Sequence, residues 1–360
     1  MPNPILTRAI DALASSRDLS VEESAEVLAE IMHGDVSEIQ IAAFLIALRT
    51  KGETVEELAG LARTMRALSA HVLSDREDLL DTAGTGGGRS TFNVSTTAAL
   101  IAAGAGCAVA KHGNRSATSR SGSADLLEAL GARIDLDPQG VAACIEEAGF
   151  GFMFAPAHHQ ATRFVVPVRH DLAVRTVFNL LGPLTNPAGA PRQLIGVSDA
   201  SFLERMAGAL ATLGVARALV VAGDDGLDEV SASTTTKVVE VNGEEITRYT
   251  LDPLELGIDS AGAGARERDG GTPQENAAVT RAILEGAGGG DGAPVGTELA
   301  VINAGAAIYV AGGAQTIAEG VRIAREAIAD GRAAGALERY LAASQAHAPA
   351  HPEGPRQARG

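Results

Sequence analysis

Residues 81–125 gather the groups that could bind a phosphorylated sugar. They contain a glycine cluster at 84–88, the Ser/Thr-rich sequence FNVSTT at 92–97 and the run KHGNR at 111–115. Backbone amides without bulky side chains, hydroxyls at the start of a helix and fixed cations are the groups that hold phosphate in proteins. This stretch therefore predicts a site for a polyphosphate ligand.

The sequence FNVSTT strengthens that interpretation of the glycine cluster. It places Asn93, Ser95 and Thr96 at the start of a predicted helix, where free amides and the helix dipole favour an anion by roughly 0.3–1 kcal/mol at an exposed site. A plain turn followed by a helix cap would give the same pattern. The cluster does not combine the dinucleotide-binding glycine spacing with a following acidic residue. It is not a Walker loop either, because no Gly-Lys-Ser/Thr closes it.

Lys111 ends a predicted apolar strand, so its ammonium group is expected at the edge of the sheet where α/β proteins bind ligands. The amide of Asn114 in the following turn offers a donor and an acceptor to a second ligand. SATSRSGSAD (116–125) adds hydroxyls and another helix start. Each cation alone is typical of a solvated surface. Lys111, Arg115 and Arg120 nevertheless lie among hydroxyl and glycine positions, which favours a small anion as their ligand.

Two adjacent carboxylates follow another predicted strand. Asp228 and Glu229, in the sequence GLDE, come shortly after the apolar run ALVVAG at 218–223. Carboxylates are hard oxygen ligands for Mg²⁺, which proteins often share with the phosphate oxygens of a substrate. Taken alone, the pattern is more typical of a solvated acidic turn, and only together with the other motifs does it indicate a magnesium site.

The rest of the chain indicates the elements that position these groups. From residue 79 onward, short apolar runs alternate with helical patterns, which predicts an α/β fold with a central mixed, mostly parallel sheet flanked by helices. The predicted strands are 79–84, 107–111, 195–197, 218–223 and 237–241. The predicted helices are 95–104, 122–130, 138–148, 200–213, 273–286, 297–311 and 315–343. Residues 252–272 and 286–297 are expected to be irregular.

Residues 4–70 show a run of short amphipathic helices with clear starts. Three pairs have the spacing of a capping box: Ser20 with Glu23, Ser37 with Gln40, and Thr54 with Glu57. Gly34 and Gly52 follow as stops. The expected parts are a small helical domain at 1–72 joined by helices from about 165–185, a large α/β domain at 73–345, and a disordered tail at 346–360.

The composition narrows the class of protein. The 360 residues carry a formal net charge of −16, so nucleic-acid binding would need a local basic stripe against an adverse field. Cys107 and Cys144 lie in apolar stretches and are expected to be buried free thiols in a reducing cytosol. No basic region followed by an apolar run opens the chain, and the apolar stretch 96–110 is too short to span a bilayer. We expect a cytoplasmic protein with no nucleic-acid or membrane partner.

Together these motifs resemble those of the anthranilate phosphoribosyltransferases. The matching sequences are, in order, GTGG, FN-x-ST, KHGN-R-S, SGSAD, PVR, RTVFNLLGPLTNP and GLDE. KHGNRS with SGSAD and the long RTVFNLLGPLTNP are the most specific of them. The resemblance covers about 5–343 and includes the helical opening IQIAAFLIALRTKGETVEELAG and the late segment QENAAVTRAILEG.

The resemblance implies an activity and a set of ligands. The family transfers the 5-phosphoribosyl group from phosphoribosyl pyrophosphate to the amine of anthranilate in tryptophan biosynthesis, and it releases pyrophosphate. By motif, the residues that would contact phosphoribosyl pyrophosphate are Gly84, Gly87, Thr91, Asn93, Ser95, Thr96, Lys111 and Ser123. Anthranilate would bind Asn114 and Arg169, and Mg²⁺ would bind Ser95, Asp228 and Glu229. A homodimer is implied by the resemblance alone.

Such a reaction needs little covalent help from the protein. Positive charge develops at the ribose C1 as pyrophosphate leaves, and Lys111 together with Mg²⁺ would stabilise the leaving anion. The aromatic amine of anthranilate is uncharged at neutral pH, so positioning could supply much of the rate, up to roughly 7–11 kcal/mol. We therefore expect no covalent nucleophile. His112 is either a weak proton acceptor or a residue that packs the turn.

The chain departs from the family pattern at three places. The family's glycine loop usually reads GTGGDG, and here the aspartate is missing between Gly87 and Gly88. Gln160 and Thr162 replace a proline and a methionine, and Ala173 replaces a glycine. The missing carboxylate is expected to change substrate affinity or metal dependence. The other replacements lie near the expected anthranilate tunnel and are expected to affect acceptor preference.

Two other functions stay open at this point. A pyrimidine nucleoside phosphorylase shares the helical-plus-α/β architecture and the glycine loop, but KHGN and the carboxylates of GLDE argue against it. A non-catalytic relative that binds nucleic acid or a regulatory ligand would tolerate the missing aspartate. The net negative charge argues against nucleic acid as its ligand. The transferase is favoured over both.

Overall fold

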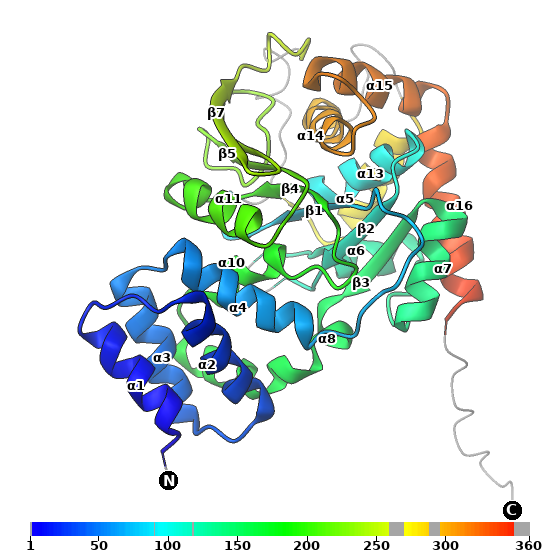
Figure 1. The fold of residues 1–360 in the computed structure, drawn as a ribbon. Helices are drawn as coiled ribbons and strands as arrows, with labels where there is room; N and C mark the ends of the chain where they lie inside the picture. Colours follow the sequence, from blue (N-terminus) through cyan, green and yellow to red (C-terminus); the bar gives the residue numbers. More distant parts are fainter. Residues whose placement is uncertain (1, 90, 117–118, 259–269, 288–295, 349–360) are drawn as a thin grey trace, which may run out of the picture.

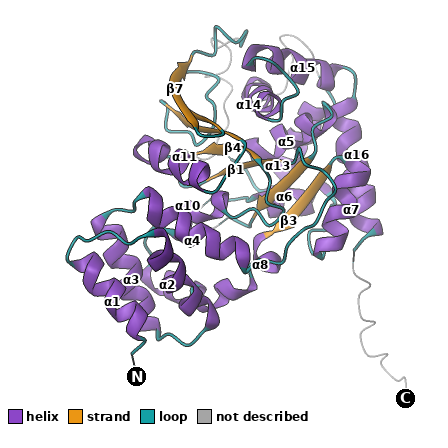
Figure 2. Cartoon of the chain, viewed as in Figure 1, coloured by secondary structure: helices purple, strands orange, loops and turns teal. Residues whose placement is uncertain are grey.

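The chain forms a helical unit at one end and a sheet covered by helices at the other (Figure 1). The computed structural model describes residues 2–89, 91–116, 119–258, 270–287 and 296–348. Figure 2 shows that the strands gather in the larger part, away from the N-terminal helices. This arrangement confirms the predicted fold class.

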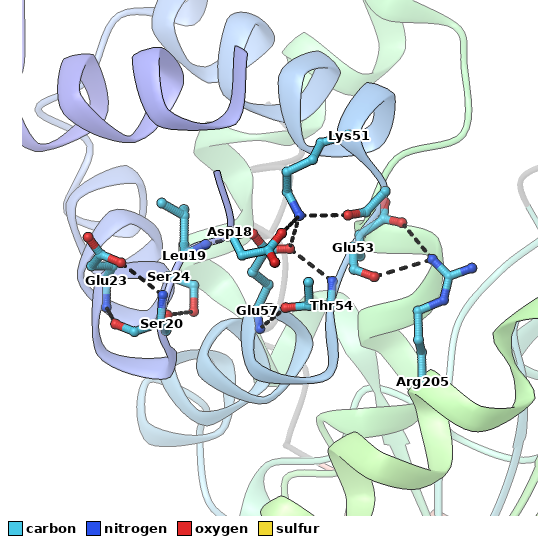
Figure 3. Close-up of polar contacts among 11 residues, drawn as sticks. Asp18, Leu19, Ser20, Glu23, Ser24, Lys51, Glu53, Thr54, Glu57 and Arg205 are labelled. Atoms are coloured by element: carbon cyan, nitrogen blue, oxygen red, sulfur yellow. Dashed lines mark hydrogen bonds and ion pairs between the residues drawn. The ribbon is translucent and has the colours of Figure 1, made fainter. Parts of the chain in front are cut away.

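Four helices make up the helical unit: α1 (Pro4–Ala14), α2 (Val21–His33), α3 (Glu38–Lys51) and α4 (Val55–Ala67). Ion pairs of Lys51 join two of these helices to the turn before α2 (Figure 3). The Lys51 ammonium at the end of α3 lies 2.6 Å from the Asp18 carboxylate and 3.0 Å from that of Glu57. The Glu57 carboxylate also accepts hydrogen bonds from the backbone amides of Leu19 and Thr54. One buried acidic side chain therefore joins α3, α4 and the turn before α2.

Two of the three predicted capping boxes are present. Ser20 with Glu23, and Thr54 with Glu57, each satisfy the other's backbone amide. The third prediction was wrong, because the Gln40 side chain does not return to its own helix start. The Ser37 hydroxyl does accept from the Gln40 amide. The Gln40 side chain donates instead to the carbonyl before α1 and to a threonine hydroxyl on α1, so it joins two helices rather than capping one.

A later segment packs on the helical unit. It contains the 3-10 helix η1 (Gln160–Phe164), α9 (Val166–Leu172), α10 (Phe178–Leu181) and η2 (Gly182–Leu184). A single hydrophobic core runs from these helices through α1–α4 to one face of the sheet, with members that include Leu45, Val168, Leu180, Leu210 and Val239. Arg205 adds a polar link from the sheet side, since it donates to the Glu53 carbonyl at 3.2 Å. The boundary near residue 72 stays a prediction.

The sheet has seven strands in the order β3-β2-β1-β4-β5-β6-β7. The strands are β1 (Leu80–Gly84), β2 (Val109–Gly113), β3 (Phe150–Phe154), β4 (Arg192–Gly196), β5 (Arg217–Gly223), β6 (Thr236–Asn242) and β7 (Glu245–Leu251). The first five run parallel, and β6 and β7 are antiparallel to their neighbours. The predicted mixed, mostly parallel sheet is thus confirmed, and the carboxyl ends of β1, β2, β4 and β5 meet at one edge.

The sequence analysis missed two strands. The buried strand β3 is a run of five residues, FGFMF, and its glycine and short length hid it between two helical patterns. The edge strand β7 is largely exposed and alternates polar with apolar residues. A hairpin signal precedes it, because Gly243 and Glu244 form the two-residue turn between β6 and β7, and Gly243 has a φ of 60°.

Helices cover both faces of the sheet. The remaining helices are α5 (Val94–Gly104), α6 (Ser123–Leu130), α7 (Pro138–Ala148), α8 (Ala155–His158), η3 (Ala200–Phe202), α11 (Leu203–Thr212), α13 (Pro273–Leu284), α14 (Thr297–Val310), α15 (Ile317–Ala329) and α16 (Arg332–Ala346). The helix predicted at 315–343 is two helices, because Gly331 adopts a left-handed conformation between them. Most of the predicted tail at 346–360, and most of the irregular segments at 252–272 and 286–297, lie outside the described residues.

Both cysteines are buried free thiols, as predicted. Burial raises the pKa of Cys107 and of Cys144 to about 12, so neither is a reactive thiolate at neutral pH. Within the described ranges, the helices are all too short or too polar to cross a bilayer.

Candidate active site

The glycine loop leaves β1 at the edge where the parallel strands end. Gly86 and Gly87 have φ values of 66° and 79°, a conformation that favours glycine. The Gly86 amide donates to the Asp228 carboxylate at 2.9 Å. A Cβ on Gly84 would lie 2.6 Å from the same carboxylate, and one on Gly196 would overlap the Asp228 carbonyl. Small residues therefore let the GLDE turn pack directly against the loop.

Lys111 lies within this arrangement rather than projecting from it. The residue is in the middle of β2 and only 2 % exposed. Its ammonium group donates to the carbonyl and the hydroxyl of Thr82, and to the Ser95 hydroxyl at 3.3 Å. The expectation that it emerges freely at the sheet edge was wrong. Burial lowers the pKa of Lys111, while the charges of Asp81 and Glu229 oppose that shift.

Asp228 and Glu229 are half-buried beside Lys111 and the start of α5. Burial raises the pKa of Asp228. Burial and the neighbouring Asp228 raise the pKa of Glu229 to about 8, against the charge of Lys111 and a hydrogen bond from the Ser95 amide. The charges of Lys111 and Arg175 do not offset these shifts, and a divalent cation would add positive charge here.

The donors present fit Mg²⁺. The two carboxylates and the Ser95 hydroxyl are hard oxygen ligands, the kind that Mg²⁺ prefers. In the part of the chain that the structure describes, no group of three acidic, histidine or cysteine side chains is arranged to hold a metal alone. Mg²⁺ usually takes one or two protein carboxylates and leaves its other positions to water and phosphate oxygens. These residues could therefore hold the metal together with a phosphorylated ligand.

Asp81 is a buried site residue that the sequence analysis did not single out. Its carboxylate accepts from the His112 amide at 3.0 Å and from the Asn186 side chain at 2.8 Å. Asn186 also donates to the Ala110 carbonyl, so both partners of Asp81 fix β2 next to Lys111. An acidic residue inside an apolar strand was the available signal.

Asn93 joins three segments around the phosphate loops. Its side-chain oxygen accepts from the Ser121 hydroxyl at 3.0 Å and from the Asn276 amide at 2.9 Å, and its nitrogen donates to the Ser121 carbonyl. Below this contact, Thr97 and Thr280 share a hydrogen bond of 2.9 Å. Asn276 on α13 was missed, because nothing in its local sequence relates it to a residue 183 positions earlier.

The segment after Lys111 makes more hydrogen bonds and ion pairs with its own residues than its sequence indicated. The Ser123 hydroxyl donates to the Asn114 carbonyl at 3.2 Å, and Asn114 itself is exposed. The Arg115 guanidinium pairs with the carboxylates of Asp125 and Glu128. The predicted cluster of three cations is therefore wrong in one member, because two carboxylates of α6 neutralise Arg115.

The other predicted residues surround the loop. Gly87 is exposed and Thr91 is half-buried. The Thr96 hydroxyl is buried and has no hydrogen-bond partner among the described residues. Arg169 lies farther along, on α9, where its guanidinium packs on the Phe178 ring at 5.3 Å. Burial lowers the pKa of Arg169, and none of the ion pairs among the described residues includes it.

Three histidines lie between the Lys111 strand and η1. The rings of His112 and His159 are 5.0 Å apart, and the His112 Nδ1 lies 3.2 Å from the Gly182 carbonyl. Burial lowers the pKa of His112, His158 and His159, so all three are neutral at pH 7. The Nε2 atoms of His112 and His158 are buried without a partner among the described residues.

Comparison with known proteins gives the family. Residues 7–69 match a model described as a glycosyl transferase family helical bundle domain, and residues 76–334 match the a/b domain of that family. An anthranilate phosphoribosyltransferase of Rubrobacter xylanophilus is 49 % identical over 342 residues, which is 95 % of this chain and 98 % of the relative. This chain belongs to the anthranilate phosphoribosyltransferase family.

Solved structures of the family agree with this assignment. The crystal structure of an anthranilate phosphoribosyltransferase from Thermus thermophilus is similar with a TM-score of 0.87 and 46 % identity, over 94 % of this chain and 99 % of that one. The Saccharomyces cerevisiae enzyme in complex with phosphoribosyl pyrophosphate and Mg has a TM-score of 0.84 and 29 % identity, over 95 % and 98 % of the two chains. A further structure of the yeast enzyme contains 4-fluoroanthranilate.

The structure shows the surroundings of three departures from the pattern of anthranilate phosphoribosyltransferases. Where the loop aspartate is missing, a Cβ on Gly88 would lie 2.8 Å from the Gly226 carbonyl and 3.3 Å from the Asp228 carboxylate. Ala173 ends α9 with a φ of 50°, a left-handed conformation in which glycine is the usual residue. The Thr162 hydroxyl donates to the carbonyl of His159, the residue before η1, so it stabilises the start of this helix.

Proposed function

We propose that this protein is an anthranilate phosphoribosyltransferase: it transfers the 5-phosphoribosyl group of phosphoribosyl pyrophosphate to the amine of anthranilate and releases pyrophosphate. The observation that carries the proposal is the meeting of Lys111, Ser95 and the Asp228–Glu229 pair beside an exposed glycine loop. Amides, a cation and a pair of carboxylates are groups that bind a magnesium-bound diphosphate.

The proposed roles divide the site into two pockets. The glycine loop, the start of α5, Lys111 and Ser123 face phosphoribosyl pyrophosphate, and Ser95, Asp228 and Glu229 hold Mg²⁺. When bound, Mg²⁺ neutralises the charge of the leaving diphosphate. Lys111 adds a fixed positive charge there, which a buried position makes more effective.

Anthranilate is assigned to the second pocket, near α9 and Asn114. The Arg169 guanidinium is half-buried and has no carboxylate partner among the described residues, so the carboxylate of the acceptor would form its ion pair. The neutral His112 ring leaves its Nε2 as an acceptor. Positioning, rather than a covalent nucleophile, supplies the rate.

One assay tests the proposed activity. The purified protein is incubated with phosphoribosyl pyrophosphate, Mg²⁺ and anthranilate, and the loss of anthranilate fluorescence is followed. Absence of turnover by a folded protein would contradict the proposal. Phosphorolysis of a pyrimidine nucleoside by inorganic phosphate would support the nucleoside phosphorylase alternative instead.

We also propose that the protein is a cytoplasmic homodimer that associates through the helical unit. The α3 helix buries Ile41, Phe44 and Leu45 but leaves Ile39 82 % exposed and Ile46 partly exposed on another side. A helix that is apolar on two sides is typical of one that packs against two partners. Two buried thiols and a place in amino-acid biosynthesis support a cytoplasmic location.

A further inference from the structure

Arg175 lies on the glycine loop although it belongs to the segment between α9 and α10. Its guanidinium donates to the Gly86 carbonyl at 3.1 Å, and both terminal nitrogens lie 3.4 Å from the Ser198 hydroxyl. Ser198, which follows β4, donates to the same Gly86 carbonyl at 3.0 Å. The side chain is therefore held over the loop by two contacts and is not a freely moving surface arginine.

The backbone of Arg175 is fixed from the opposite side. Arg49, on α3, donates to the Arg175 carbonyl at 2.7 Å. A Cβ on Gly87 would lie 2.7 Å from the nearest Arg175 nitrogen, so the guanidinium packs directly on the Gly87 backbone. Arg175 thus reaches from the helical unit to the loop that is assigned to the diphosphate.

The charge of Arg175 is not neutralised within the described chain. Its hydrogen-bond acceptors are a carbonyl and a hydroxyl, and no ion pair among the described residues includes it. Arg115, by contrast, pairs with two carboxylates. The charge of Arg175 is nevertheless felt at the metal-binding carboxylates: burial raises the pKa of Asp228, and Arg175 opposes that shift.

We propose that Arg175 binds a phosphate oxygen of phosphoribosyl pyrophosphate at the glycine loop, as a cation of the diphosphate site alongside Lys111. This inference rests on the proposed function. A guanidinium carries five N–H donors, and two neutral contacts leave donors for a phosphate. The loop of this chain has no carboxylate of its own between Gly87 and Gly88, so an arginine there meets the diphosphate without an acidic competitor.

The test measures binding of inorganic pyrophosphate with Mg²⁺ to the full-length protein by calorimetry. Arg175→Met should weaken binding about 10- to 100-fold, the range of a charge-assisted hydrogen bond. Arg175→Lys keeps the charge and should stay within about threefold of the wild type. Added NaCl should weaken binding less steeply in Arg175→Met than in the wild type, because one screened charge contact is gone. Arg322→Met, on the exposed face of α15, is the matched control and should bind normally.

Several outcomes would overturn the proposal. They are a wild type that does not bind pyrophosphate, Arg175→Met binding within twofold of the wild type, or Arg175→Lys binding as weakly as Arg175→Met. The last would mean that the arginine acts only by shaping the loop through the Gly86 carbonyl. If Arg175→Met loses its native circular dichroism spectrum, the affinity and salt dependence of Arg175→Lys decide alone. Anthranilate turnover by the wild type tests the proposed function separately, so the two failures are distinguishable.

Discussion

Arg169 distinguishes the two proposed pockets, because it is assigned to anthranilate and not to phosphoribosyl pyrophosphate. Its guanidinium is half-buried and packs on the Phe178 ring. Arg169→Ala should raise the KM for anthranilate about 10- to 100-fold, because a charge-assisted pair with the acceptor carboxylate is lost. The KM for phosphoribosyl pyrophosphate should change far less. Steady-state kinetics with each substrate varied in turn measure both values.

A nearby arginine provides the control for this change. Arg163 is exposed, and its guanidinium lies 4.6 Å from the Phe164 ring, so Arg163→Ala removes a similar group outside the pocket. It should leave both constants within about twofold of the wild type. Equal losses for both substrates in Arg169→Ala would show that the two pockets are wrongly assigned.

The raised pKa of Glu229 predicts how the free energy of unfolding depends on pH. Burial and Asp228 raise the pKa of Glu229 to about 8 from its ordinary 4.5. The folded protein then holds a proton that the unfolded chain has released, so the free energy of unfolding of the metal-free protein falls as the pH rises from about 5 to about 8. Mg²⁺ favours the ionised carboxylate and should raise the unfolding temperature more at pH 8 than at pH 6. Calorimetric scans with and without Mg²⁺ measure this.

The variant Glu229→Gln identifies the group responsible. It has the same shape but cannot ionise, so most of the decline in stability between pH 6 and pH 8 should vanish, together with the added effect of Mg²⁺. A decline of unchanged size in this variant would assign the titration to another group.

The C-terminal end of α9 contains a local strain that can be relieved. Ala173 has a φ of 50°, and a left-handed conformation costs a residue with a Cβ roughly 1–2 kcal/mol. Glycine loses about 0.4–1 kcal/mol through the entropy of the unfolded chain. Ala173→Gly should therefore raise the free energy of unfolding by up to about 1 kcal/mol, measured by urea denaturation.

The matched control is an alanine at the end of α5. Ala105 has a φ of −80°, so glycine brings no relief there, and Ala105→Gly should lower the free energy of unfolding. A loss of stability in both variants would show that Ala173 is not strained.

The helix α13 is predicted to position the phosphate site from a distance. Asn276 is 2 % exposed and donates to Asn93 at the start of α5. Asn276→Ala should cost about 1–3 kcal/mol of stability and raise the KM for phosphoribosyl pyrophosphate, because it leaves buried hydrogen-bond partners unsatisfied. Gln274→Ala, at an exposed position of the same helix, should change neither. An unchanged KM in Asn276→Ala would reduce Asn276 to a purely structural residue.

Local patterns predicted most elements but not the contacts between them. The strands that lead to Lys111 and to the GLDE turn were predicted correctly, because an apolar run or a helix start is encoded by residues adjacent in the sequence. The same reasoning failed for Gln40, whose side chain has an equally good partner on another helix. It also missed the edge strand β7. Most of this strand is exposed, so its residues are largely polar and form no apolar run.

The site was predicted in the same uneven way. The resemblance implied that Ser95, Lys111 and Asp228 share one site, and they lie together where the parallel strands end. Arg175 and Asn276 lie in two segments that carry the resemblance, but nothing in their local sequence shows that packing brings them to that edge. The burial of Lys111 was missed for the same reason.

The assembly of the whole protein can be tested on α3. Ile39 is exposed in the single chain and would be buried in the proposed dimer. Ile39→Asp should raise the dimer dissociation constant by at least roughly tenfold, because a carboxylate would lose water in an apolar contact. Light scattering coupled to size-exclusion chromatography measures the mass. Leu254→Asp, which changes an exposed apolar residue in the sheet part, should leave the mass unchanged.

A monomeric wild type would contradict the dimer, and a dimer that survives Ile39→Asp would move its interface elsewhere. Neither result would touch the assignment of the active site, because the residues placed in it all come from one chain.

The hydrophobic core shared by α1–α4 and one face of the sheet limits how the protein can be taken apart. A cut near residue 72 would leave apolar surfaces on both fragments, with Val168 and Leu180 on one and Leu45 on the other. The helical unit is therefore a poor module for transplantation, although its sequence looks self-contained. A fusion partner or an affinity tag is better placed after α16, where an added segment divides no core.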